Sequence, residues 1–114
     1  MLDHIAMNGV PFAKVANLTD TTPAALVAAE PGHVHVVTDY RAVNGHASVN
    51  TEVQLLSGAA TILDRTWCQS LGGGTNGPFR TGKATASGEA LNVKAITTGA
   101  NVLISVAGYT RKVL

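Results

Sequence analysis

The stretch that decides the fold runs from Gly88 to Thr110 and reads GEALNVKAITTGANVLISVAGYT. Apolar and polar residues alternate along residues 90–97 and again along 101–109, and a period of two is typical of strands with one buried face. The residues between them, Thr98, Gly99 and Ala100, form a turn signal. The stretch therefore predicts two antiparallel strands. One Glu and one Lys are its only charged residues, so it offers little chemistry.

The rest of the chain repeats this pattern, with few helix signals. Turn residues divide it into six further segments that read as strands, at residues 12–18, 24–29, 33–43, 49–56, 61–69 and 79–85. Alternation predicts that the even positions from Val34 to Ala42 share one face, and that Thr51, Val53 and Leu55 lie on the opposite side of their strand from Glu52 and Gln54. About eight short strands at roughly 8–12-residue spacing predict an all-β antiparallel β-sandwich, and this number suits a jelly roll. An immunoglobulin-like sandwich is the rival, although its second cysteine is missing.

Two segments fall outside the predicted strands. Residues 1–11 have no clear period and contain several apolar side chains, so we interpret them as an N-terminal arm and residues 12–114 as the β-sandwich domain. The glycine-rich run from Gly72 to Pro78 reads as a long loop that holds no strand.

Composition limits the possible functions. Charged residues make up 13% of the 114 residues, about half the usual share, and apolar residues make up 46%. Such a chain has neutral surface that a partner can cover. A net charge of +1 gives no reason to expect nucleic acid or an acidic membrane as partner. The start of the chain lacks the features of a secretion signal, and no apolar run is long enough to span a membrane, so we expect synthesis in a cytoplasm.

The best metal candidates are His33, His35 and Asp39. On a regular strand the two histidines would point to the same side and could share one ion, with the carboxylate on that side too. The spacing faintly resembles the first motif of cupins, which are jelly-roll metalloenzymes, but Asp39 stands where cupins have Glu and the second motif is absent. We interpret the two histidines as polar residues on the solvent face of a strand, and keep a cupin-like enzyme as the less favoured alternative.

Other catalytic patterns are weaker. Residues 77–84 match the start of a phosphate-binding loop, but Ala84 stands where a magnesium-binding Ser or Thr is needed and no helix pattern follows. Cys68 lies inside a predicted strand, which favours a packed thiol over a nucleophile. The sequence predicts a protein that is not an enzyme and uses no cofactor.

The quoted stretch resembles the C-terminal part of small jelly-roll proteins encoded among the structural genes of tailed bacteriophages. There, a G-x-A-L-N-V strand follows a glycine-rich loop, and a hairpin such as TTGANVLISVAGY ends the chain. The front half, TTPAALVAAEPGHVHVVTDYRAVNGHASVNTEVQLLSGAATIL, also has their order of strands and turns. The likeness covers residues 21–109.

The resemblance implies a fold related to tumour-necrosis-factor-like trimers and a capsid decoration or cement function. The implied protein is a homotrimer that binds the major capsid protein on the outside of a phage head, and it belongs to the virion after synthesis in the host cytoplasm. In that setting the arm residues Leu2, Ile5 and Phe12 are our candidates for partner contacts.

An alternative of a different class is a receptor- or carbohydrate-binding module of a phage tail or fibre. The loop at Gly72–Pro78, with Trp67 and Tyr40 near it, would form the binding site.

Overall fold

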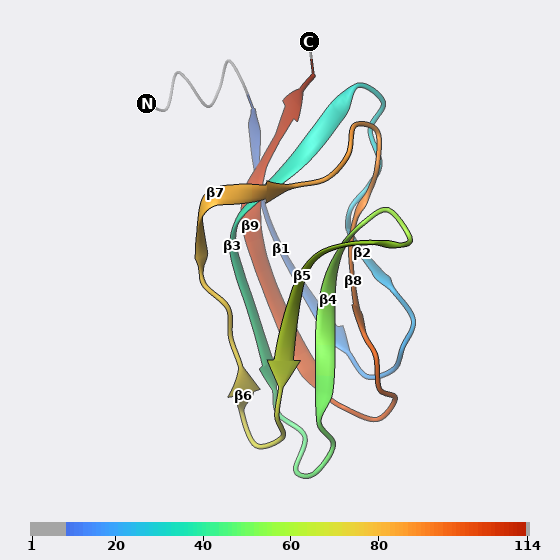
Figure 1. Ribbon diagram of the computed structural model, residues 1–114, viewed down its shortest axis with the longest axis vertical. Helices are drawn as coiled ribbons and strands as arrows, with labels where there is room; N and C mark the ends of the chain where they lie inside the picture. The colour runs from blue at the N-terminus through green and yellow to red at the C-terminus, as the bar shows by residue number, and fades with distance from the viewer. Residues whose placement is uncertain (1–8, 114) are drawn as a thin grey trace.

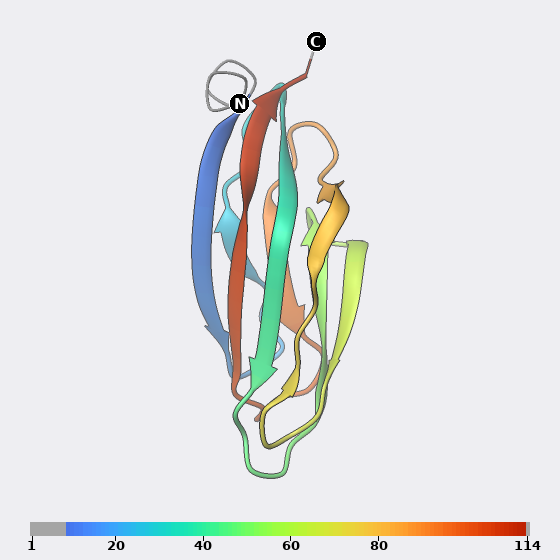
Figure 2. The ribbon, with the colours of Figure 1, turned by 90° about the vertical axis from the view of Figure 1, so that its left-hand side faces the viewer.

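The computed structural model describes residues 9–113, and these form an all-β structure of two antiparallel sheets packed face to face (Figures 1 and 2). The strands are β1 (Val10–Leu18), β2 (Ala24–Val27), β3 (His33–Asn44), β4 (Thr51–Ser57), β5 (Thr61–Cys68), β6 (Gly73–Gly74), β7 (Pro78–Ala84), β8 (Leu91–Ala95) and β9 (Val102–Lys112).

One sheet has the order β1-β9-β3-β6, with β7 also paired to β3, and we call it the five-strand sheet. The other, the four-strand sheet, has the order β2-β8-β4-β5. The first strand pairs with the last, β2 pairs with β8, β3 with β7, and β4 with β5. The chain is thus one long hairpin, closed at β4–β5 and wrapped around itself. That pairing defines the jelly roll, so the predicted fold class is confirmed.

All eight predicted strands are present, with ends shifted by a few residues. The first begins at Val10 and therefore includes the last two residues assigned to the arm. The ninth strand, β6, lies in the glycine-rich run, so the prediction that this run holds no strand was wrong. Gly73 and Gly74 pair with Asn44 and Val43. Gly74 has a φ of 126°, and a Cβ there would overlap the carbonyl oxygen of Ala42, so the pairing requires glycine.

The core lies between the sheets and consists of the inward residues of both. In β4, Thr51, Val53 and Leu55 point inward and Glu52 and Gln54 outward, as the alternation predicted. The core cluster also includes Leu18, Leu26, Val37, Tyr40, Ala42, Cys68, Leu91, Val93, Ala95, Ala100, Val102, Ile104 and Val106.

A β-bulge divides strand β3. The register with β9 shifts between Val37 and Asp39, so Thr38 is an extra residue. Before the bulge the inward residues have odd numbers, such as His35 and Val37, and after it they have even numbers, such as Tyr40. The prediction that all even positions of this strand share one face was wrong, because one extra residue reverses the alternation.

Candidate functional site

His35 is a structural residue of the interior, so the prediction that it lies on the solvent face of its strand was wrong. Its ring is 1% exposed and lies between two partners. Nε2 is 2.8 Å from the carbonyl oxygen of Ala28, and Nδ1 is 2.7 Å from the hydroxyl of Thr110. The carbonyl can only accept, so Nε2 carries a proton and donates it, and Nδ1 and the threonine hydroxyl form the second hydrogen bond. Both ring nitrogens are therefore used by the fold.

The other two metal candidates lie apart from His35. His33 is half-buried, and its Nδ1 is 2.9 Å from the carbonyl oxygen of Pro31. Asp39 follows the bulge and is exposed on the outer side of the sheet, whereas His35 points inward. The prediction that all three share one face was wrong for this reason. Across residues 9–113, no group of three His, Cys, Asp or Glu side chains is placed to hold a metal ion.

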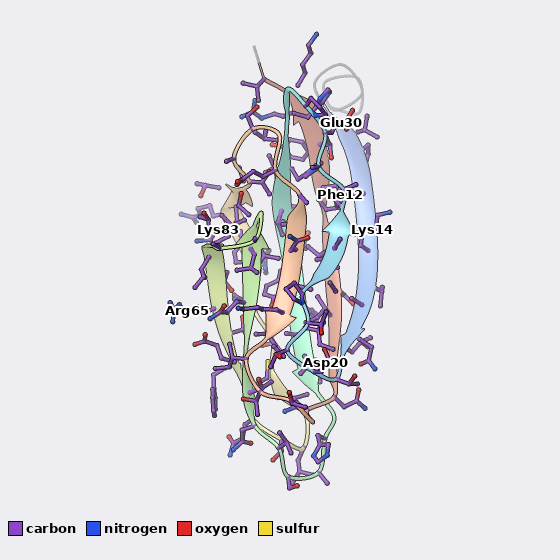
Figure 3. The ribbon with its side chains drawn as sticks, turned by 90° about the vertical axis from the view of Figure 1, so that its right-hand side faces the viewer. Phe12, Lys14, Asp20, Glu30, Arg65 and Lys83 are labelled. Carbon is purple, nitrogen blue, oxygen red and sulfur yellow. The ribbon has the colours of Figure 1, made fainter. Side chains whose placement is uncertain are left out.

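The partner candidates at the N-terminus are only partly described. Leu2 and Ile5 lie outside the described residues. Phe12 is half-buried and packs against the core, with its ring edge-on to His35 at 6.3 Å between ring centroids. Its position in β1 is seen in Figure 3. The ring is therefore occupied by contacts within the sandwich.

The structure separates the two aromatic residues that were expected to flank the glycine-rich loop. Tyr40 is 1% exposed and stacks on Phe79 inside the sandwich, with 6.4 Å between ring centroids. Trp67 is 60% exposed and points away from the core. A binding site that uses both side chains, as the alternative function required, does not form.

Two ionisable groups in the interior stay protonated at neutral pH. Burial raises the pKa of the Cys68 thiol to about 11. Burial, with a smaller contribution from Cys68, also raises the pKa of Tyr40 well above its ordinary value. The Tyr40 hydroxyl has no hydrogen-bond partner among the described residues. A protonated, buried thiol is a packed side chain and not a nucleophile.

The outer side of the five-strand sheet has a region with few charges, formed by parts of β1, β9 and β3. We call this region the five-strand face and define it by the outward residues within 13–17 of β1, 103–107 of β9 and 39–43 of β3: Ala13, Val15, Asn17, Leu103, Ser105, Ala107, Asp39, Arg41 and Val43. Val15 is 70% and Leu103 51% exposed. Only Asp39 and Arg41 in this set carry charge, so the face is a neutral and partly apolar surface.

The five-strand face has a shallow depression of about 300 Å³. Its lining includes Ala13 and Val15 from β1, Ala107 from β9 and Pro78 from β7, and three charged residues, Lys14, Asp39 and Arg41, also line it. Small side chains along β1 and β9 produce the hollow, because alanine and serine leave space beside the larger residues. The depression can receive an apolar side chain of a partner.

The outer side of the four-strand sheet has a different composition. We call it the four-strand face and define it by Glu52, Gln54, Arg65, Trp67, Lys94 and Ile96. Glu52 lies opposite Trp67, and Gln54 lies between Arg65 and Lys94. Figure 3 looks onto this sheet and shows Arg65 projecting from β5. The face thus combines one exposed indole ring with a group of polar side chains.

Comparison with known proteins found no match to this chain among family models, curated proteins or solved structures. Within residues 9–113, no helix is long and apolar enough to cross a membrane.

Sequence reasoning predicted neutral surface and named Trp67, but it did not locate either face. The signal was available in β9, where Leu103, Ser105 and Ala107 alternate with the buried residues. The position of Asp39 and Arg41 could not be found in this way, because it depends on the bulge.

Proposed function

We propose that this protein is a non-enzymatic virion protein that decorates the outside of a tailed-phage head as a homotrimer and stabilises the head. The observation that carries the proposal is the five-strand face, where Val15, Leu103 and Val43 are exposed on a surface with few charges. Depletion of charge and exposure of apolar side chains distinguish the cores of protein–protein interfaces. We assign the contact between subunits to this face.

The fold supports the proposal in a second way. A jelly roll has sheet edges that must be protected from unwanted pairing, and β1 and β5 lie at edges of their sheets. A closed ring of three subunits covers surface without growing into filaments. Three weak contacts to the coat then add through trivalency, so the trimer binds the head far more tightly than one subunit does.

The expected partner is the major capsid protein, and the expected location is the capsid surface. The test uses heads assembled from the coat protein of the virus that carries this gene, without decoration. We expect the purified protein to sediment with these heads and to raise the temperature at which they break. Absence of sedimentation with the heads at micromolar concentration would contradict the proposal.

A further inference from the structure

The four-strand face contains the only tryptophan of the chain, Trp67, and this ring is 60% exposed. An indole ring is a large apolar surface with one polar N–H group, and tryptophan is enriched at the sites where proteins bind their partners. The pairing of β4 with β5 places Glu52 directly opposite it, at the short spacing of neighbouring strands.

The side chains around the ring are polar and partly fixed in orientation. The Nε2 amide of Gln54 donates a hydrogen bond to Oε2 of Glu52 at 2.8 Å, and Nη1 of Arg65 is 3.8 Å from the same oxygen. Gln54 is only 9% exposed, so its amide is held within the sheet surface. This network does not use the second carboxylate oxygen of Glu52 or the amide oxygen of Gln54, and these two atoms can accept hydrogen bonds from a ligand.

The composition decides between two kinds of ligand. The core of a protein interface is enriched in Trp and Arg but depleted of Glu and Lys. Glu52, opposite Trp67, and Lys94, two strands away from it in β8, are therefore the residues that favour a ligand other than a protein. A pyranose sugar needs the combination found here, because its C–H face packs on an aromatic ring while its hydroxyl groups exchange hydrogen bonds with carboxylate, amide and guanidinium groups. Residues i and i+2 of a strand are roughly 6.7 Å apart, so the ring and the polar groups lie within reach of one or two sugar units.

We propose that the four-strand face is a glycan-binding site, with Trp67 as the platform and Glu52, Gln54 and Arg65 as the hydrogen-bonding groups. The inference does not depend on the capsid function. It keeps Trp67 from the alternative site and replaces the glycine-rich loop and Tyr40 with polar side chains of β4 and β5. The face is not a deep pocket, so binding of single glycans is weak and gains strength from several copies on one particle.

The test uses the fluorescence of Trp67 as a direct reporter, because it is the only indole in the chain. We titrate the full-length protein with cellohexaose and chitohexaose as neutral probes and with a hyaluronan octasaccharide as an acidic one. We expect a saturable blue shift of the Trp67 emission and its protection from acrylamide quenching with at least one probe. Comparison of the neutral probes with the acidic one shows whether Arg65 and Lys94 favour an acidic sugar.

Three variants separate a glycan site from other roles, with binding measured by calorimetry. Trp67→Ala removes the platform and should abolish detectable binding. Gln54→Ala should weaken it about tenfold, the effect of losing about 1.4 kcal/mol of hydrogen bonding. Leu103→Ala, on the opposite sheet, should leave it unchanged. Circular dichroism and the melting temperature show that each variant is folded.

Two outcomes would overturn the inference. One is the absence of any saturable fluorescence change with all three probes. The other is binding by Trp67→Ala that equals the wild type. Loss of head binding in Trp67→Ala without any glycan binding would assign this ring to a protein interface instead.

Discussion

The two outer faces of this sandwich differ in composition, whereas the inner sides of its two sheets are alike. The five-strand face contains alanine, serine, valine and leucine with one acidic and one basic residue, whereas the four-strand face contains a tryptophan among charged and amide side chains. Both sheets bury similar aliphatic residues on their inner sides. The shared interior explains the fold, and the contrast between the outer faces carries the functional proposals.

The two sheets also differ in how many glycines their strands contain. Every glycine within a strand belongs to the five-strand sheet, at positions 73, 74, 82 and 108, and the four-strand sheet has none. Glycine in a strand marks a bulge or a close approach of two backbones. The five-strand sheet is therefore the one in which local backbone geometry decides which side chains face outward.

The largest effect on stability that we predict comes from a substitution at one of these strand glycines. A Cβ on Gly108 would overlap the carbonyl oxygen of Val36, next to the bulge of β3. We expect Gly108→Ala to lower the free energy of unfolding by about 3 kcal/mol or more, because backbone atoms must move. Gly45→Ala is the matched control, since its Cβ would have only the carbonyl oxygen of Asn101 nearby, at 3.8 Å, and should change stability by less than about 0.5 kcal/mol. Equal urea midpoints for the two variants would contradict the prediction.

A smaller effect concerns the interior that both sheets share. The folded-state pKa of Cys68 is raised to about 11 from an ordinary value of 9.0, so the native state holds this proton more tightly than the unfolded state. The stabilisation is complete below pH 9 and is lost as pH rises from 9 to 11, at up to about 1.4 kcal/mol per pH unit. Tyr40 adds to the loss above pH 10, because its pKa is raised too.

Urea unfolding at pH 8, 9 and 10 checks this expectation. Cys68→Ala provides the control, since it removes the thiol and should flatten the pH dependence between 9 and 10 even if it is less stable throughout. If the free energy of unfolding falls with pH equally steeply in both proteins, the Cys68 thiol is not the cause of the pH dependence.

The smallest effect comes from the hydroxyl of Tyr40, which is buried without a hydrogen-bond partner among the described residues. Tyr40→Phe keeps the stacking on Phe79 and removes a polar group that has lost its hydration. We expect the melting temperature to stay the same or rise, with a gain of up to about 1 kcal/mol. Tyr109→Phe, at a half-buried position, should change little. A loss of more than about 1 kcal/mol in Tyr40→Phe would mean that the hydroxyl has a partner.

Much of the fold could be predicted because its signals are local. Alternation in residues 49–56 gave the inward and outward sides of β4, and turn residues separated all eight predicted strands. The pairing of β1 with β9 joins residues such as Leu18 and Val102 that are far apart in sequence, and no local pattern specifies that register. The jelly-roll prediction rested on the number of strands.

The candidate site was harder to predict, and strand β3 shows why. A single extra residue, Thr38, turns Asp39 outward while His35 stays inside, so an apparent cluster of metal ligands is divided. The threonine itself gives no signal, because a bulge depends on the backbone of the neighbouring strand at Gly108. The exposure of Trp67 likewise depends on which side of β5 faces the other sheet.

The most direct test of the central claim is the mass of the protein in solution, because we assign subunit contact to the five-strand face. Leu103 and Ile96 are similarly exposed, at 51% and 47%, and lie on opposite outer faces. In sedimentation velocity at micromolar concentration, we predict a trimer for the wild type and for Ile96→Asp, and a folded monomer for Leu103→Asp. A wild-type monomer, or a trimer that Leu103→Asp leaves intact, would contradict the account.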